Sequence, residues 1–132
     1  MKNIQELQEF LKDIFSDVIL FIESHKIDVV ARIGFSENSA YALRAYLSFA
    51  LQPGDELVVL SIDCKYHENG LILESDIATT NGEIIAEGPT IQIKNYNQDE
   101  FNTHSSLWVE QFVRFIDKSR ETLLENIKIS TL

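Results

Sequence analysis

The sequence predicts an α+β fold in which an antiparallel β-meander of four or five strands is covered on one face by the N- and C-terminal helices. Apolar residues recur every three or four positions near both ends of the chain, as in amphipathic helices. Between these ends, short β-rich stretches are separated by turn-forming pairs, two of which are Asn-Gly. The 132 residues, 45% of them hydrophobic, suffice for one core, so we expect residues 1–132 to form a single domain.

The two helices are expected near the chain ends, over residues 3–24 and 104–128. Asn3 is the expected N-cap of the first helix, and Thr103 or Asn102 that of the second. One face of the second helix is made of Trp108, Phe112, Phe115, Ile116, Ser119, Leu123 and Ile127, and the first three form a bulky stripe. Such a stripe is usually core, but where exposed it would be an interface anchor or a dimer seam, so Trp108 and Phe112 are candidate interface aromatics.

Strands are expected between the helices. The stretch 40–51 fits either secondary structure, because its alanines and leucines favour a helix while its apolar residues alternate as in a strand; we favour a strand. Thr90 to Tyr96 follows Gly88-Pro89 and is expected to be a bulged continuation or an edge strand. The other expected strands cover residues 27–35, 57–66, 71–80 and 83–87.

The two Asn-Gly pairs set the expected strand registers. As two-residue type I′ turns, they place Glu68 opposite Leu71 and Thr80 opposite Glu83. One face of the sheet then gathers the apolar residues that the helices should cover. These residues are Leu60, Ile62, Cys64, Tyr66, Leu71, Leu73, Ile77, Ile84 and Ala86.

The opposite face of the predicted sheet carries a row of carboxylates. The registers place Asp63 opposite Asp76, Asp76 opposite Glu87, and Lys65 opposite Glu74. Like charges that face each other across strands destabilise a sheet by up to about 1 kcal/mol, so the row needs either water or a cation. Three interpretations follow: a solvated face, a docking site for Lys or Arg side chains of a basic protein, or a Ca²⁺ site, which the missing loop spacing disfavours.

The charge balance narrows the classes of partner. Eleven basic and 21 acidic residues give a net charge of −10, which repels nucleic acid and anionic membranes. The longest apolar runs fall far short of the roughly 20 residues that span a bilayer. A single cysteine, Cys64, excludes an internal disulfide and suits a reducing compartment, so we expect a cytoplasmic protein with no nucleic-acid or membrane partner.

Catalytic and cofactor motifs are not evident. Cys64 and His67 have C-x-x-H spacing, but a zinc site needs further ligands, and Cys64 is expected to be a buried hydrophobe. His104 precedes Ser105 and Ser106 without a nucleophile elbow, so these serines are more simply caps. The glycines form no phosphate-binding loop, and we expect no enzyme activity, no cofactor and no metal.

The stretch Gly70 to Pro89, GLILESDIATTNGEIIAEGP, resembles a segment of the TriTu family of small α+β immunity proteins. The resemblance, together with the helix, meander, helix order, implies neutralisation of a secreted toxin. The family is named for its tryptophans, whereas the one tryptophan of this chain, Trp108, lies outside the matched stretch. The resemblance therefore carries over no functional residue.

The function expected from these patterns is binding of a basic protein through Asp63, Glu74, Asp76 and Glu87, in the manner of an immunity-type inhibitor. One alternative is a small enzyme or ligand-binding domain with a pocket between helices and sheet. Another is a homodimer like the type III secretion chaperones, which would require a helix at residues 40–51.

Overall fold

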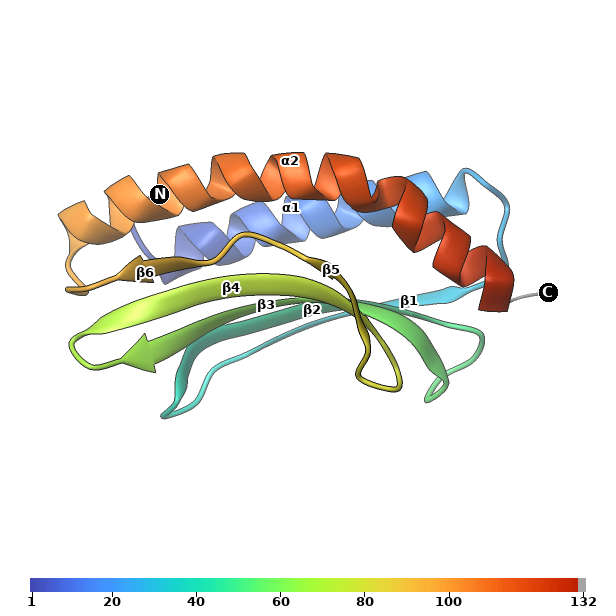
Figure 1. The fold of residues 1–132 in the computed structure, drawn as a ribbon, viewed down its shortest axis with the longest axis horizontal. Helices are drawn as coiled ribbons and strands as arrows, with labels where there is room; N and C mark the ends of the chain where they lie inside the picture. Colours follow the sequence, from blue (N-terminus) through green and yellow to red (C-terminus); the bar gives the residue numbers. More distant parts are fainter. Residues whose placement is uncertain (131–132) are drawn as a thin grey trace.

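The computed structural model, which describes residues 1–130, has two layers: an antiparallel sheet and two helices that cover one of its faces (Figure 1). The expected fold class is therefore confirmed, and the segment after the fourth strand is divided into two short strands. The elements are α1 (Ile4–Glu23), β1 (Val30–Ser36), β2 (Tyr41–Ala50), β3 (Glu56–His67), β4 (Gly70–Thr79), β5 (Ile84–Glu87), β6 (Ile91–Ile93) and α2 (Gln98–Ser130).

The sheet has the strand order β1-β2-β3-β4-β5, and β6 also pairs with β4. β5 pairs with residues 76–78 of β4, whereas β6 pairs with residues 71–73. The two short strands therefore lie one after the other along the same edge of β4, and Gly88 and Pro89 fall between them. This arrangement confirms that the segment after Pro89 forms an edge strand.

Side-chain caps set the start of both helices. Asn3 accepts the N–H of Glu6 at 2.9 Å, as expected. At the start of α2, however, the cap is Asn97, which accepts the N–H of Glu100 at 2.9 Å. Thr103 and Asn102 lie inside the helix, so the expected start at residue 104 was wrong; the added first turn buries Phe101.

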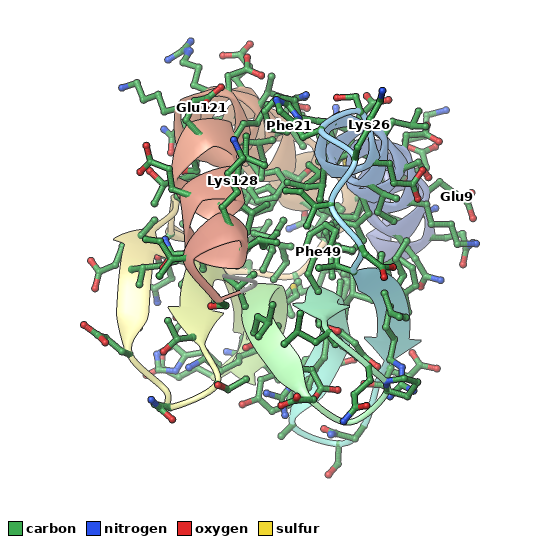
Figure 2. The ribbon with its side chains drawn as sticks, turned by 90° about the vertical axis from the view of Figure 1, so that its right-hand side faces the viewer. Glu9, Phe21, Lys26, Phe49, Glu121 and Lys128 are labelled. Atoms are coloured by element: carbon green, nitrogen blue, oxygen red, sulfur yellow. The ribbon has the colours of Figure 1, made fainter. Side chains whose placement is uncertain are left out.

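The segment 40–51 forms β2, which confirms the strand that alternation favours over the helix. Its side chains Leu43, Ala45, Leu47 and Phe49 are buried on the helix side of the sheet. Figure 2, which views the layers end-on, shows Phe49 pointing into the space between sheet and helices. The facing residues of β3, which are Val58, Leu60 and Ile62, supply matching buried apolar surface.

The predicted register of the β3–β4 hairpin was wrong by two residues. His67 pairs with Gly70, so Glu68 and Asn69 form the turn, and Glu68 has a φ of 55°. Gly70 is the first residue of β4, and a Cβ there would collide with the backbone carbonyl of Ile93 in β6. Glycine is thus needed at this position for the close approach of β6, and not for the turn.

The β4–β5 hairpin follows the predicted register only in part. Ile77 pairs with Ala86 as expected, but a bulge follows, and Thr79 instead of Thr80 bonds to Glu83. Gly82, at a φ of 81°, closes this wider loop.

A register shift of two residues leaves every side chain on its predicted face, so most of the expected core is confirmed. Leu60, Ile62, Cys64, Leu71, Leu73 and Ile77 are buried. Ala86 is partly buried against this core, and Tyr66 and Ile84 are the exceptions, since each is about half exposed. Tyr66 lies at the hairpin end of β3. The bulge pairs Ile84 with Ala78, which lies on the opposite face of β4 from the buried Ile77, so Ile84 points away from the core.

Candidate functional site

Four carboxylates share the face of the sheet that the helices leave open, which we call the outer face. Asp63 belongs to β3, Glu74 and Asp76 to β4, and Glu87 to β5. Side chains alternate along a strand, and the neighbours of these residues in β3 and β4 are buried under the helices. We call Asp63, Glu74, Asp76 and Glu87 the acidic row.

The observed register changes which carboxylates face each other. Asp63 lies opposite Glu74, and Asp76 opposite Ser61, so the expected Asp63–Asp76 pair was wrong. The expected Asp76–Glu87 pair is confirmed. The acidic row therefore consists of two neighbouring pairs, Asp63 with Glu74 and Asp76 with Glu87.

Cations compensate one of these two pairs. The Arg44 Nε atom lies 3.1 Å from Oδ1 of Asp63, and the Lys65 Nζ atom lies 2.8 Å from Oε1 of Glu74. Lys65 pairs with Ile72 in the ladder, so its ammonium reaches Glu74 diagonally instead of from the expected opposite position. The hydrogen bond and the charge of Glu74 raise the pKa of Lys65.

Asp76 and Glu87 have no such compensation. No ion pair or hydrogen bond joins either side chain to another residue of the described chain. Gly88 donates its N–H to the carbonyl oxygen of Ser75 at 3.0 Å, so the adjacent Asp76–Glu87 pair occupies a non-hydrogen-bonded position, where facing side chains lie closest. Partial burial raises the pKa of Asp76, and the charges of Asp63, Glu74 and Glu87 raise it further.

The uncompensated pair borders a shallow depression of about 240 Å³ on the outer face. Three of its lining residues are acidic, namely Glu74, Asp76 and Glu87. The others are Ser75, Ile84, Gly88 and Thr90. A second depression, of about 330 Å³, surrounds the Arg44–Asp63 ion pair and Tyr46. Two open depressions that contain charged side chains suit the side chains of a protein partner better than an enclosed small molecule.

Trp108 and Phe112 do not contribute to this surface. Both are fully buried, and their rings stack with centroids 4.6 Å apart. The proposal that they anchor an interface is therefore not supported, because neither side chain is exposed to a partner. Their helical spacing places both residues on the apolar face of α2, and this face packs on the sheet.

Cys64, which was considered for catalysis, neighbours Asp63 along β3 but is buried on the opposite face of the sheet. Burial raises the pKa of Cys64 to about 12, and the charge of Asp63 adds to this shift. His67 lies exposed beside Glu68, at 4.0 Å. Among residues 1–130, no three His, Cys, Asp or Glu side chains are placed to share a metal ion.

His104 and its neighbouring serines lie within α2 and serve the helix. The His104 ring is 2.8 Å from the carbonyl oxygen of Glu100. Ser105 is buried, and Ser106 accepts a hydrogen bond from the N-terminal ammonium at 3.3 Å. The serines are thus not helix caps, because the helix begins seven residues earlier than Ser105.

Two basic residues near the acidic row were missed by the sequence reasoning. Arg114 and Lys118 of α2 line a depression that also contains Glu87 and Gly88. Their spacing of one helical turn is visible in the sequence, but their position beside β5 depends on how the helix crosses the sheet.

No family model, curated protein or solved structure matches the chain. Neither helix in the described part is long and apolar enough to cross a membrane. The function proposed below consequently depends on the geometry of the acidic row itself.

Proposed function

We propose that the chain is a non-enzymatic binding module whose acidic row captures a basic protein partner. The observation that carries the proposal is the facing pair Asp76 and Glu87, which forms no ion pair with a cation of the described residues, while the other pair of the row forms two. Lys or Arg side chains of a partner would supply the missing positive charge. Complementary charge raises the rate of association and disfavours wrong partners.

The raised pKa of Asp76 supports this proposal in energetic terms. Its carboxylate is harder to ionise than a solvated one because of partial burial and its acidic neighbours. A cation bound at the pair would relieve this repulsion, so binding would be favoured by an interaction that the free protein lacks. The surrounding Arg44 and Lys65 are already paired, which leaves Asp76 and Glu87 as the expected centre of recognition.

An immunity-type inhibitor of a basic toxin would be one form of this function, as the resemblance to TriTu proteins implies. A net charge of −10 suits such a role in the cytoplasm, where the partner would be captured before it acts. The chaperone-like alternative needed a helix at residues 40–51, and that segment is β2. For the enzyme alternative, Cys64 is buried with a raised pKa, and His104, although 3.4 Å from a carboxylate oxygen of Glu100, contacts the backbone carbonyl of Glu100 within its own helix.

Affinity capture from the native lysate, with mass spectrometry of the captured proteins, tests the proposal when three forms of the bait are compared. The wild type should retain one stoichiometric basic protein at low salt and lose it at about 0.5 M salt, where charges beyond roughly 4 Å are screened. Asp76→Lys with Glu87→Lys should abolish this capture. The matched control, Asp13→Lys with Asp17→Lys on the exposed side of α1, has the same net charge and should retain it.

Equal loss in both double variants would contradict the proposal, because it would show that total charge rather than the acidic row captures the partner. Unchanged capture by the first variant would contradict it as well. We expect all three proteins to fold, because the four substituted side chains are not buried. Thermal unfolding of each protein checks this.

A further inference from the structure

The free edge of the sheet at β5 lies beside the acidic row. β5 is the last strand of the sheet order and pairs with β4 alone among the described strands. Because the N–H of Gly88 points to β4, alternation directs the N–H and C=O of Glu87 away from the sheet. These two backbone groups can therefore pair with a further strand.

Depressions lie on both sides of this edge, and both include Glu87 and Gly88. The depression on the outer face, of about 240 Å³, is bordered by the acidic row. The one on the helix side has a volume of about 340 Å³, and its further lining residues are Pro89, Gln111, Arg114, Phe115 and Lys118. The edge of β5 thus separates an acidic surface from a basic one.

The two basic residues of this surface form no ion pair with the described residues. Arg114 and Lys118 are exposed, and no ion pair or hydrogen bond joins them to another residue of the described chain. They lie one helical turn apart, a spacing at which like charges repel. In a chain with 21 acidic and 11 basic residues, two neighbouring cations without a partner favour the binding of carboxylates.

We propose that an extended segment of the partner pairs with the edge of β5, with its basic side chains on Asp76 and Glu87 and its intervening acidic side chains on Arg114 and Lys118. Successive side chains of a strand point to opposite faces, so alternating charge in the segment matches the two surfaces. Addition of a strand to a sheet edge is a common mode of peptide recognition. The inference rests on the proposed function and specifies the partner's recognition element.

The local backbone limits this pairing to a short segment. β5 has four residues, and Pro89, which follows Gly88, has no N–H to donate. A bound segment would therefore pair along β5 alone, and charge alternation would supply most of the selectivity.

Synthetic peptides provide a direct test. The probe is acetylated, amidated Lys-Glu-Lys-Glu-Lys-Glu, compared with the block peptide Lys-Lys-Lys-Glu-Glu-Glu and with hexalysine, by fluorescence anisotropy at low ionic strength. The wild type should bind the alternating peptide about tenfold more tightly than the block peptide, which corresponds to about 1.4 kcal/mol. Binding should also slow hydrogen exchange of the Glu87 amide.

Two variants separate the roles of the two surfaces. Arg114→Glu with Lys118→Glu should remove the preference for the alternating peptide and leave binding of hexalysine intact or stronger. The matched control, Lys2→Glu with Arg32→Glu, changes the net charge equally at two exposed sites away from β5 and should keep the preference. Loss of the preference in both variants would overturn the inference.

Other outcomes distinguish this inference from the proposed function. Equal binding of alternating and block peptides, together with binding of hexalysine, would overturn the edge-pairing inference and leave the acidic row as a docking site. Hexaglutamate is a fourth peptide in this comparison, and its binding as tightly as the alternating peptide would also overturn the inference, by revealing an independent anion site. If neither hexalysine nor the alternating peptide bound, the proposed function itself would fail.

Discussion

The indole N–H of Trp108 donates a hydrogen bond to the carbonyl oxygen of Pro89 at 3.0 Å, and this contact joins α2 to the break between β5 and β6. The Ser75 hydroxyl donates to the same carbonyl at 3.2 Å. Pro89 is thereby held from the helix and from the neighbouring strand. The two bonds hold the chain two residues after Glu87, the residue that pairs with Asp76.

Trp108→Phe should lower the free energy of unfolding by about 2 kcal/mol, because it removes this hydrogen bond and leaves space beside Phe112. Urea denaturation measures the change. Leu107→Ala, at a position 48% exposed on the same helix, is the control and should alter stability by less than about 0.5 kcal/mol. Equal effects of the two substitutions would contradict the structural role of the indole.

Gly70→Ala should destabilise the protein more than Gly88→Ala. A Cβ at Gly70 would collide with the backbone carbonyl of Ile93, which cannot move without breaking the β4–β6 pairing. At Gly88 the obstacles are the Ser75 hydroxyl and the Phe115 ring, which can rotate. We expect losses of about 3 kcal/mol or more and about 1–2 kcal/mol respectively, measured by urea denaturation; the reverse order would contradict the observed register.

Asp76→Asn should stabilise the protein at pH 7 and have less effect near pH 4. The folded state raises the pKa of Asp76 above its ordinary value of 3.8, so the folded protein binds this proton more tightly than the unfolded chain. The stability that this tighter proton binding gives the folded state is therefore fully present below pH 3.8. It is lost as the pH rises through the folded pKa of Asp76.

The measurement for Asp76 is the difference in unfolding free energy between variant and wild type at both pH values. The contributions of carboxylates distant from Asp76 are common to both proteins and cancel in the difference. Asp13→Asn on α1 provides the control and should give a small difference at either pH. A stabilisation by Asp76→Asn that grew toward pH 4 would contradict the assigned environment.

Cys64 should react slowly with thiol reagents while the protein is folded. The side chain is fully buried, and its pKa is raised to about 12, so the thiolate is scarce at pH 8. A variant with Cys64→Ala and Ser61→Cys moves the thiol to the outer face of the same strand and should react at least about 100-fold faster, as followed by absorbance of a released chromophore. Similar rates would contradict the burial of Cys64.

The sequence predicted the elements of this fold better than their pairing. Alternation of apolar residues identified β2 despite its alanines, since burial on the helix side requires that period. The β3–β4 register was wrong because Gly70 was assigned to the turn, whereas a contact with β6 requires glycine in the strand. Such a requirement comes from a distant segment, so local turn preferences do not reveal it.

The acidic row shows the same division between local and distant information. All four carboxylates were assigned to the correct face, because a shift of two residues preserves side-chain direction. The cation partner of Asp63 was not identified, since Arg44 comes from β2, whose register depends on a longer loop. The position of Arg114 and Lys118 beside β5 likewise depends on helix packing.

The most direct test of the central claim is an NMR titration of the isotopically labelled protein with hexalysine at low salt. The account predicts that the largest backbone shift changes cluster at Asp63, Glu74, Asp76 and Glu87, and that Glu9 and Asp13 on α1 change little. Asp76→Lys with Glu87→Lys should remove the clustered changes. Shift changes spread evenly over the acidic residues, or concentrated on α1, would contradict the claim that the outer face of the sheet is the docking surface.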